Sequence, residues 1–110
     1  MKLFEPSVVV VVPCFNESRR LDCRAFYDFV EQTSFVKFLM VNDGSTDQTS
    51  VLLRTMHLRH PERIQVLDLP HNQGKAEAVR QGLLSAIDDG APLVAYWDAD
   101  LATPLSAIGQ

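Results

Sequence analysis

The stretch Ser7-Val-Val-Val-Val-Val12, followed at once by Pro13-Cys-Phe-Asn-Glu17, decides how the rest of the sequence is interpreted. An unbroken run of β-branched residues is typical of a strand that is buried on both faces of a sheet. Pro13 is expected to end this strand, because proline cannot donate to a sheet ladder. Strands of this kind occur in parallel sheets covered by helices, so the run predicts a layered α/β fold.

Outward from this strand, short apolar segments alternate with longer amphipathic ones. We expect helices over 21–33, 49–58 and 75–89, and further strands over 36–41, 64–69 and 93–97. Asp47 or Thr46 is expected to cap the second helix, and Pro104 is expected to precede another helix near Leu105. Alternation of strands and helices requires parallel strands joined by right-handed crossovers. The sequence therefore predicts an α/β three-layer sandwich with a mostly parallel sheet, formed by a single domain over residues 1–110.

Composition excludes several classes of protein. Ten Lys and Arg oppose fourteen Asp and Glu, giving a net charge of -4, so a nucleic acid is not an expected partner. The longest apolar run, 8–12, is far shorter than the ~20 residues that span a bilayer, and no secretory leader is recognisable. Cys14 and Cys23 lack zinc spacing and are expected to be reduced thiols. We therefore expect a cytoplasmic protein, located at the cytoplasmic face of a membrane in a longer form.

Unusual polar residues follow each expected strand. Ligands of open α/β sheets bind beyond the carboxyl ends of the strands, so these segments are expected to form one site. The segments are Pro13–Glu17, Asn42–Asp47, His71–Lys75 and Asp98–Asp100.

The pair Asp98-Ala-Asp100 concentrates negative charge at the end of one strand. Two neighbouring carboxylates repel each other unless a cation offsets the repulsion, and oxygen ligands suit Mg2+ or Mn2+. The alternative is structural, with Asp98 ending the strand and Asp100 forming a turn. The position beside three other polar strand ends favours the metal site.

The segment Asn42-Asp43-Gly44 interrupts the chain directly after an apolar strand. Asp43 is a candidate acceptor for a ring N–H of a nucleobase, whereas the alternative is a turn followed by a helix cap made by Asp47. We expect Asp43 to be functional and Asp47 structural. A calcium-binding loop is excluded, because Arg54 stands where the closing Glu would be required.

Gly74 precedes the third expected helix and Lys75 is its first residue; the N-terminus of a helix favours an anion. The alternative for Lys75 is an exposed side chain in a first turn, although the helix dipole disfavours a cation there. Cys14 has no sequence neighbour that would make it a nucleophile. The three histidines are expected to be surface or packing residues; they are His57, His60 and His71.

Four motifs together resemble the family-2 glycosyltransferases, and most closely the dolichyl- or polyprenyl-phosphate sugar (glucosyl or mannosyl) synthases. They occur in the family's order and cover essentially the whole chain: Val11–Glu17, Val41–Asp47, Asn72–Lys75 with Ala78-Val-Arg80 and Gly82, and Asp98–Pro104. The resemblance implies a nucleotide-diphospho-sugar transferase (glycosyltransferase-A, Rossmann-like) fold.

The resemblance also implies roles for the matching residues. Pro13, Phe15 and Glu17 would line the nucleobase and ribose pocket. The pair after the second strand would read the base; its first member is Asn42 here, so either Asn42 or Asp43 would face the base. Gly74 and Lys75 would lie near the nucleotide, with Lys75 meeting phosphate. Asp100 would hold Mg2+ or Mn2+ through the diphosphate, and Asp98 would contact ribose or a metal-bound water.

The implied reaction is the inverting transfer of a sugar from a UDP- or GDP-linked donor to a polyprenyl or dolichyl phosphate, or to a glycan. Family members continue beyond this length into an acceptor-binding half, so 1–110 is expected to be a truncated N-terminal portion in which no catalytic residue is assignable. The alternative is a nucleotide-binding module without activity. An uncovered sheet edge would also favour self-association.

Two other classes fit the sequence less well. A Rossmann dehydrogenase requires a glycine-rich turn after the first strand, and Pro13–Glu17 contains no glycine. A phospho-receiver domain shares the α/β pattern but would not place Asp-x-Asp after the fourth strand.

Overall fold

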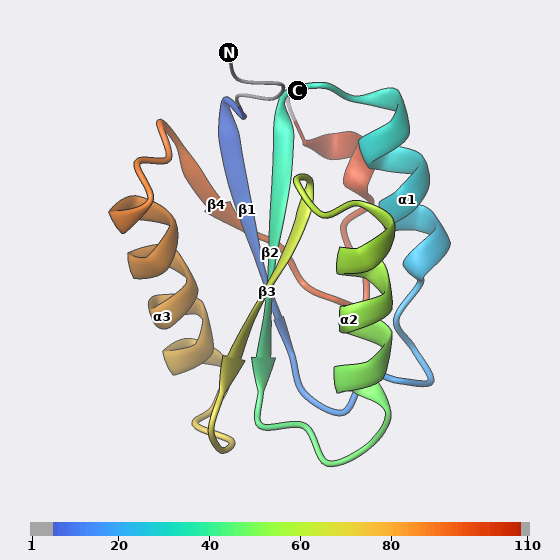
Figure 1. Ribbon diagram of the computed structural model, residues 1–110, viewed down its shortest axis with the longest axis vertical. Coiled ribbons are helices and arrows are strands. Elements are labelled where there is room, and N and C mark those ends of the chain that lie inside the picture. Colours follow the sequence, from blue (N-terminus) through green and yellow to red (C-terminus); the bar gives the residue numbers. More distant parts are fainter. Residues whose placement is uncertain (1–5, 109–110) are drawn as a thin grey trace.

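Four parallel strands form the centre of the protein, in the order β3-β2-β1-β4 (Figure 1). The computed structural model describes residues 6–108. The strands are β1 (Val8–Cys14), β2 (Val36–Asp43), β3 (Ile64–Leu69) and β4 (Val94–Tyr96). The helices between them are α1 (Cys23–Gln32), α2 (Thr49–Arg59) and α3 (Lys75–Asp88). The predicted alternation and the parallel sheet are therefore confirmed.

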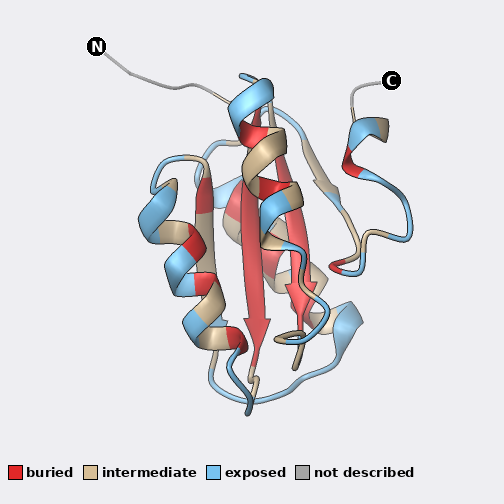
Figure 2. Ribbon diagram, turned by 90° about the vertical axis from the view of Figure 1, so that its right-hand side faces the viewer, coloured by how far each residue is buried: buried red, intermediate tan, exposed pale blue. Residues whose placement is uncertain are grey.

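The sheet separates two apolar cores, because successive strand residues point to opposite faces. Val10, Val12, Phe38 and Met40 pack against α1 and α2, whereas alternate residues such as Val11 pack against α3. Figure 1 shows α1 and α2 on one side of the sheet and α3 on the other, and Figure 2 shows the two central strands almost wholly buried. This is the predicted three-layer sandwich.

The prediction that Pro13 ends the first strand is wrong. β1 continues through Pro13 to Cys14, and Pro13 is in register with Val41 of β2. The backbone N–H of Val9 donates to the carbonyl of Leu93, so the nitrogens of odd-numbered β1 residues face β4. β4 ends at Tyr96, before the level of Pro13, so the missing N–H of Pro13 breaks no ladder hydrogen bond.

Two helix termini also differ from expectation. The N-cap position of α2 is occupied by Gln48, which makes no side-chain cap hydrogen bond. Asp47 lies one residue earlier, and its Oδ1 accepts a hydrogen bond from the backbone nitrogen of Thr49 at 2.9 Å. The helix expected near Leu105 is a single 3₁₀ turn over Leu105–Ala107.

Helix α3 approaches the sheet closely at Gly82. A Cβ at this position would collide with Val11 Cγ1 and would lie 2.8 Å from Val41 Cγ2. The absent side chain therefore lets α3 rest directly on β1 and β2, and this close packing fixes where its N-terminus lies. Within residues 6–108, no helix combines the length and the apolar character needed to cross a bilayer.

Candidate functional site

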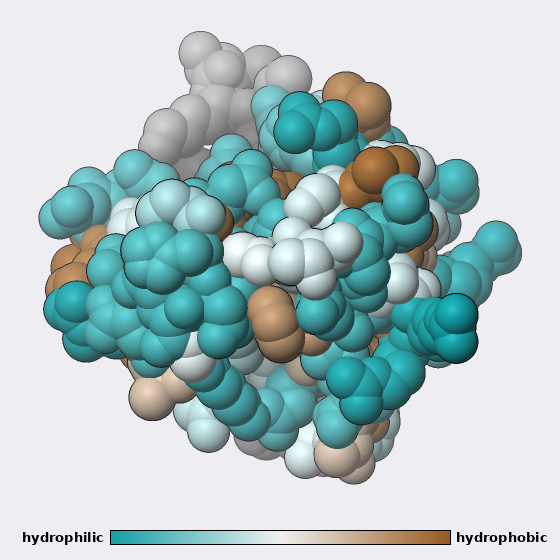
Figure 3. Space-filling view, turned by 90° about the horizontal axis from the view of Figure 1, so that it is seen from below, coloured by the Kyte–Doolittle hydropathy of each residue, from teal (hydrophilic) through white to brown (hydrophobic). Residues whose placement is uncertain are grey.

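A cavity of about 430 Å³ opens at the carboxyl ends of the strands. It is lined by residues at the carboxyl ends of the strands or in the segments that follow them: Pro13, Cys14, Phe15, Glu17, Asp43, Asn72, Gly74, Lys75, Asp98, Ala99 and Asp100. This end of the molecule is mostly hydrophilic (Figure 3). The structure thus brings eight of the nine predicted site residues to one place, and only Asn42 lies outside the cavity.

Asp43 is buried at the end of β2 and is surrounded by hydrogen-bond donors. Its carboxylate accepts from the backbone nitrogens of Gln73 (2.8 Å) and Gly74 (3.1 Å), and from Nδ2 of Asn72 (3.1 Å). These bonds tie the β3–α3 loop to β2. Sequence reasoning expected Asp43 to read a nucleobase and did not anticipate this structural role, because the partners lie about thirty residues away along the chain.

Asn42 is predicted to lie in the nucleotide pocket, and the structure places it elsewhere. It is one residue from Asp43 on a strand, so it points to the opposite face of the sheet. Its Nδ2 donates to Ser50 Oγ at 2.7 Å and to Asp68 Oδ1 at 2.9 Å, and its Oδ1 accepts from the backbone nitrogen of Ser45. Asn42 therefore joins β2 to α2 and β3, and Asp43 is the member of the pair that faces the cavity.

The β1–α1 loop is held against the β2–α2 loop by Asn16, a residue that the sequence analysis missed. Its φ of 51° is in the left-handed region, which Asn tolerates better than most residues. Its Oδ1 accepts from the backbone nitrogen of Thr46 at 2.8 Å, and its own backbone nitrogen donates to Ser45 Oγ at 3.1 Å. The next residue, Glu17, donates its backbone N–H to Thr49 Oγ1 at 2.8 Å. The sequence carries one indication of this role, because Asn16 directly precedes the predicted site residue Glu17 and Asn is common where a loop adopts a left-handed conformation.

Glu17 lines the cavity, and one of its carboxylate oxygens is buried without a hydrogen bond within residues 6–108. Its side chain is 17% exposed, and Arg20 Nε lies 3.1 Å from Oε1 as an ion pair. The geometry of that pair makes no hydrogen bond, so Oε1 is buried without a hydrogen-bond partner among the residues that the structure describes. A buried acceptor left in this way is costly unless a ligand or water donates to it.

The two carboxylates after β4, Asp98 and Asp100, have different surroundings. Lys75 Nζ, at the first residue of α3, donates to Asp98 Oδ1, and this bond raises the pKa of Lys75 above its ordinary value. Asp100 is exposed, and its Oδ1 accepts from the backbone nitrogen of Ala102 at 3.0 Å. The alternative turn role of Asp100 is therefore present in the structure, and it leaves the other carboxylate oxygen available.

The donor set suits a divalent cation shared with a ligand. Asp98 and Asp100 supply hard carboxylate oxygens at the rim of the cavity. Over residues 6–108, no group of three or more His, Cys, Asp and Glu side chains is arranged to hold a metal by itself. Mg2+ usually takes only one or two protein carboxylates and completes its coordination with phosphate oxygens and water, so these residues fit such an ion.

The remaining candidate nucleophile and bases have structural surroundings. Cys14 is buried, and burial raises the pKa of its thiol to about 12. His57 Nδ1 bonds the carbonyl of Ile64 at 2.8 Å, and His60 Nε2 lies 3.2 Å from Glu31. These contacts confirm the packing roles predicted for those two histidines. His71 is exposed.

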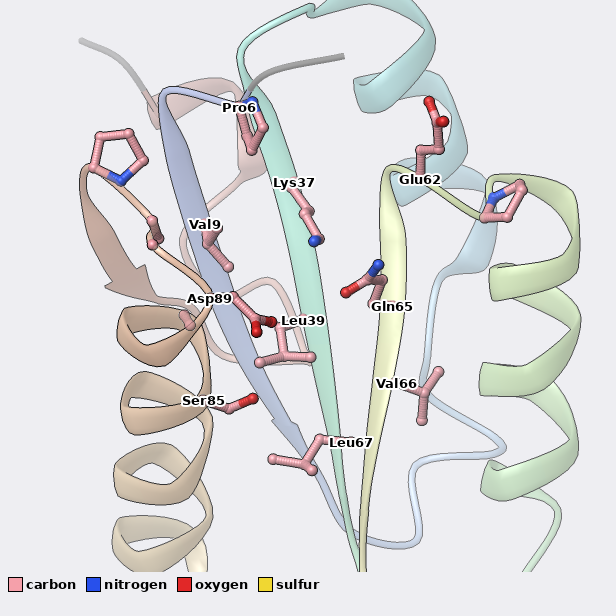
Figure 4. Close-up of a pocket in the computed structure, with 15 residues that line it drawn as sticks. Pro6, Val9, Lys37, Leu39, Glu62, Gln65, Val66, Leu67, Ser85 and Asp89 are labelled. Carbon is pink, nitrogen blue, oxygen red and sulfur yellow. The ribbon is translucent and has the colours of Figure 1, made fainter. Parts of the chain in front are cut away.

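A larger cavity, of about 600 Å³, lies at the other end of the sheet (Figure 4). Its lining includes Leu39, Leu67 and Ser85, together with Lys37 and Gln65. None of the predicted site residues borders it, and its charged groups do not converge on a common point in Figure 4. The smaller cavity is therefore the candidate functional site.

The chain is similar to several curated glycosyltransferases. It is 41% identical over 106 residues to dolichyl-phosphate beta-glucosyltransferase of Drosophila melanogaster, a match covering 86% of this chain and 31% of that protein. It is 34% identical over 103 residues to the enzyme of the same name from Mus musculus, again covering 86% and 31%. The chain thus spans about a third of the length of these relatives.

Solved structures give the same fold. A mannosyltransferase from Pyrobaculum calidifontis, solved with GDP-Man and Mn2+, matches with a TM-score of 0.71 and 26% identity, covering 89% of this chain and 28% of that one. The predicted nucleotide-sugar transferase fold is confirmed. The sequence profile of glycosyl transferase family 2 matches residues 9–109, so the chain belongs to glycosyl transferase family 2.

Proposed function

We propose that the cavity at the strand carboxyl ends binds a UDP- or GDP-linked sugar, and that the chain is the donor-binding part of a glycosyltransferase. The observation that carries this proposal is the meeting of Asp98, Asp100 and the N-terminus of α3 in one cavity. A helix N-terminus and a carboxylate-held cation both favour a diphosphate. Membership of glycosyl transferase family 2 supports the same chemistry.

The nucleoside would lie toward the β1 side of the cavity. Phe15 is 41% exposed there, so its ring is available to pack against a base or ribose. Oε1 of Glu17 makes no hydrogen bond, and a ribose hydroxyl is a suitable donor to it. Asp43 would act through its hold on Gly74, which keeps the backbone near the phosphates in place.

Asp98 and Asp100 would hold Mg2+ or Mn2+. Lys75 pairs with Asp98, whereas Asp100 forms no ion pair with a Lys or Arg within residues 6–108. The ion, when bound, stabilises negative charge on the departing diphosphate as a Lewis acid. Lys75 would bind a phosphate oxygen as a point charge. Together these groups stabilise the charge that develops as the bond between the anomeric carbon and the diphosphate breaks.

The acceptor that we propose is a polyprenyl or dolichyl phosphate, attacking the anomeric carbon directly and inverting it. The dolichyl-phosphate glucosyltransferases among the relatives support this choice. A phosphate acceptor is already an anion and needs no general base, whereas a glycan hydroxyl would require a carboxylate base. We further propose that the protein acts in the cytoplasm or at the cytoplasmic face of a membrane.

We also propose that the protein self-associates through the outer edge of β4. Among residues 6–108, β4 pairs with β1 on one side and with no strand on the other, and the exposed side chains of Leu93 (65%), directly before β4, and Tyr96 (52%), at its end, belong to this edge. An exposed strand edge with apolar side chains favours pairing with a second copy. Sedimentation showing a strict monomer at high protein concentration would contradict this.

Calorimetric titration with UDP-glucose and GDP-mannose, each with and without Mn2+, tests the proposed function. We expect one nucleotide sugar to bind at least tenfold more tightly with Mn2+, and Asp100→Asn to remove that gain. Asp88→Asn is the matched control, because it removes an exposed carboxylate at the far end of α3. Binding without transfer to dolichyl phosphate would indicate the alternative, a nucleotide-binding module. Equal binding by wild type and Asp100→Asn would refute the metal assignment.

A further inference from the structure

The contact between Lys75 and Asp98 joins two parts of the site that are distant in sequence. Lys75 is the first residue of α3, and Asp98 follows β4. The Lys75 Nζ also lies 5.9 Å from the centroid of the Tyr96 ring, so the ammonium is directed across the mouth of the cavity toward β4. The cation therefore sits against one of the two carboxylates that would hold a divalent metal.

The location of Lys75 on its helix is unfavourable by itself. The N-terminus of a helix carries partial positive charge, which repels an ammonium in the first turn. Asp98 offsets this repulsion, and Asp100 adds a weaker attraction that helps to raise the pKa of Lys75. Both side chains of the pair are substantially exposed, so water screens the ion pair and it exchanges readily for another arrangement.

We propose that Lys75 is the resident counter-ion of Asp98: it holds this carboxylate while the site lacks a nucleotide and moves to a phosphate when the metal and nucleotide bind together. This inference rests on the proposed function. Lys75 and the metal compete for Asp98, so the metal alone binds weakly. A nucleotide removes this competition by giving Lys75 a phosphate partner.

The consequence is a positive coupling between metal and nucleotide that is built into one side chain. If the nucleotide raises metal affinity by some factor, the metal raises nucleotide affinity by the same factor. Lys75→Met should strengthen the binding of metal alone, because Asp98 loses its internal competitor. The same substitution should weaken nucleotide binding, because a phosphate loses its cation.

The test consists of two measurements. The first is the affinity for Mn2+ without nucleotide, determined from the electron paramagnetic resonance signal of free aqueous Mn2+. The second is the affinity for UDP and GDP at saturating Mn2+, determined by calorimetry. For Lys75→Met we expect three- to tenfold tighter Mn2+ binding and at least fivefold weaker nucleotide binding. Lys75→Arg keeps the charge and should bind Mn2+ alone as weakly as the wild type. Arg80→Met is the matched control, since Arg80 is a cation on the same helix that pairs with Glu77, away from the cavity.

The outcomes separate this inference from the proposed function. Wild-type protein that binds neither nucleotide with Mn2+ would refute the proposed function and this inference with it. Wild-type protein that binds nucleotide with Mn2+, together with Lys75→Met whose Mn2+ affinity is unchanged or lower, would refute the counter-ion role alone. An equal gain in Mn2+ affinity in Arg80→Met would also refute it, because the effect would then be one of net charge. Thermal unfolding by circular dichroism confirms that each variant is folded.

Discussion

Replacing Asp43 with alanine tests whether this buried carboxylate organises the loop that carries Gly74 and Lys75. The substitution removes the acceptor of two backbone N–H groups, those of Gln73 and Gly74, and of the Asn72 side chain. Hydrogen bonds to a charged acceptor each contribute about 1.5–3 kcal/mol to stability. The loop residues are exposed, so water replaces part of each lost bond. We expect a loss of about 2–3 kcal/mol in total, which lowers the Tm by roughly 10 °C.

Asp43→Asn separates hydrogen bonding from volume. The amide has the shape of the carboxylate, but it keeps only one acceptor oxygen and places an NH2 group against a donor at the other position. Asp43→Asn should therefore destabilise the protein, although by less than Asp43→Ala, because one oxygen still accepts. Asp88→Asn removes one carboxylate charge from an exposed position on α3 and serves as the control.

Urea unfolding measures the stability change, and amide hydrogen exchange over 72–76 measures the loop. We expect exchange there to accelerate more than it does in β1, because the loop loses its anchor before the core opens. A loss below about 0.5 kcal/mol with unchanged loop exchange would refute the structural role. If nucleotide binding were lost while stability and exchange stayed unchanged, Asp43 would instead be a base-reading residue.

The remaining predictions concern the loops and termini around the site. Gly44→Ala should lower the free energy of unfolding by about 2–4 kcal/mol, because at a φ of +67° the new Cβ would collide with the backbone of the β3–α3 loop. Gly90→Ala is the control: its φ is +86°, but open space surrounds it, so the loss should be about 1 kcal/mol. Equal losses of the two variants in urea unfolding would contradict the collision. Arg63→Met should lower the free energy of unfolding by about 3 kcal/mol, because the guanidinium donates to the carbonyls of Val30 in α1, Thr33 after it and Val36 in β2, and methionine donates to none of them. A thermal melt like that of the wild type would contradict this. Hydrogen bonds from Thr49 and Ser18 hold the pKa of Asp47 well below its ordinary value in the folded protein. The ionised carboxylate therefore stabilises the fold above a pH of about 4, and this stabilisation is lost as the pH falls through the lowered pKa. Asp47→Asn should therefore flatten the acid limb of stability measured by urea unfolding, and an unchanged acid limb would contradict that contribution.

Much of the fold was predictable from apolar patterning. Strands β1 and β2 carry uninterrupted apolar runs, and the helices carry apolar residues at spacings of three and four. Local patterning could not predict that β1 continues through Pro13, because the reason lies in the neighbouring strand β4, which ends before that level. The last expected helix is only a 3₁₀ turn.

The location of the site was predictable, and the individual contacts were not. Parallel strands bring their carboxyl ends to one edge of the sheet, and this placed Asp43, Lys75 and Asp98 together. Which residue of Asn42 and Asp43 faces the cavity depends on strand register. The partners of Asp43 and Lys75 are set by tertiary packing across distant segments, which no local sequence pattern encodes.

The most direct test of the account is the location of Mn2+ in the nucleotide-bound protein. In ¹⁵N-labelled protein saturated with UDP or GDP, Mn2+ should broaden the amide resonances of Asp98, Asp100 and Gly74, while those of the larger cavity near Gln65 stay sharp. Asp100→Asn should abolish the broadening at the same Mn2+ concentration. Broadening centred near Gln65, or the same broadening in Asp100→Asn, would contradict a metal-assisted diphosphate site at the end of β4.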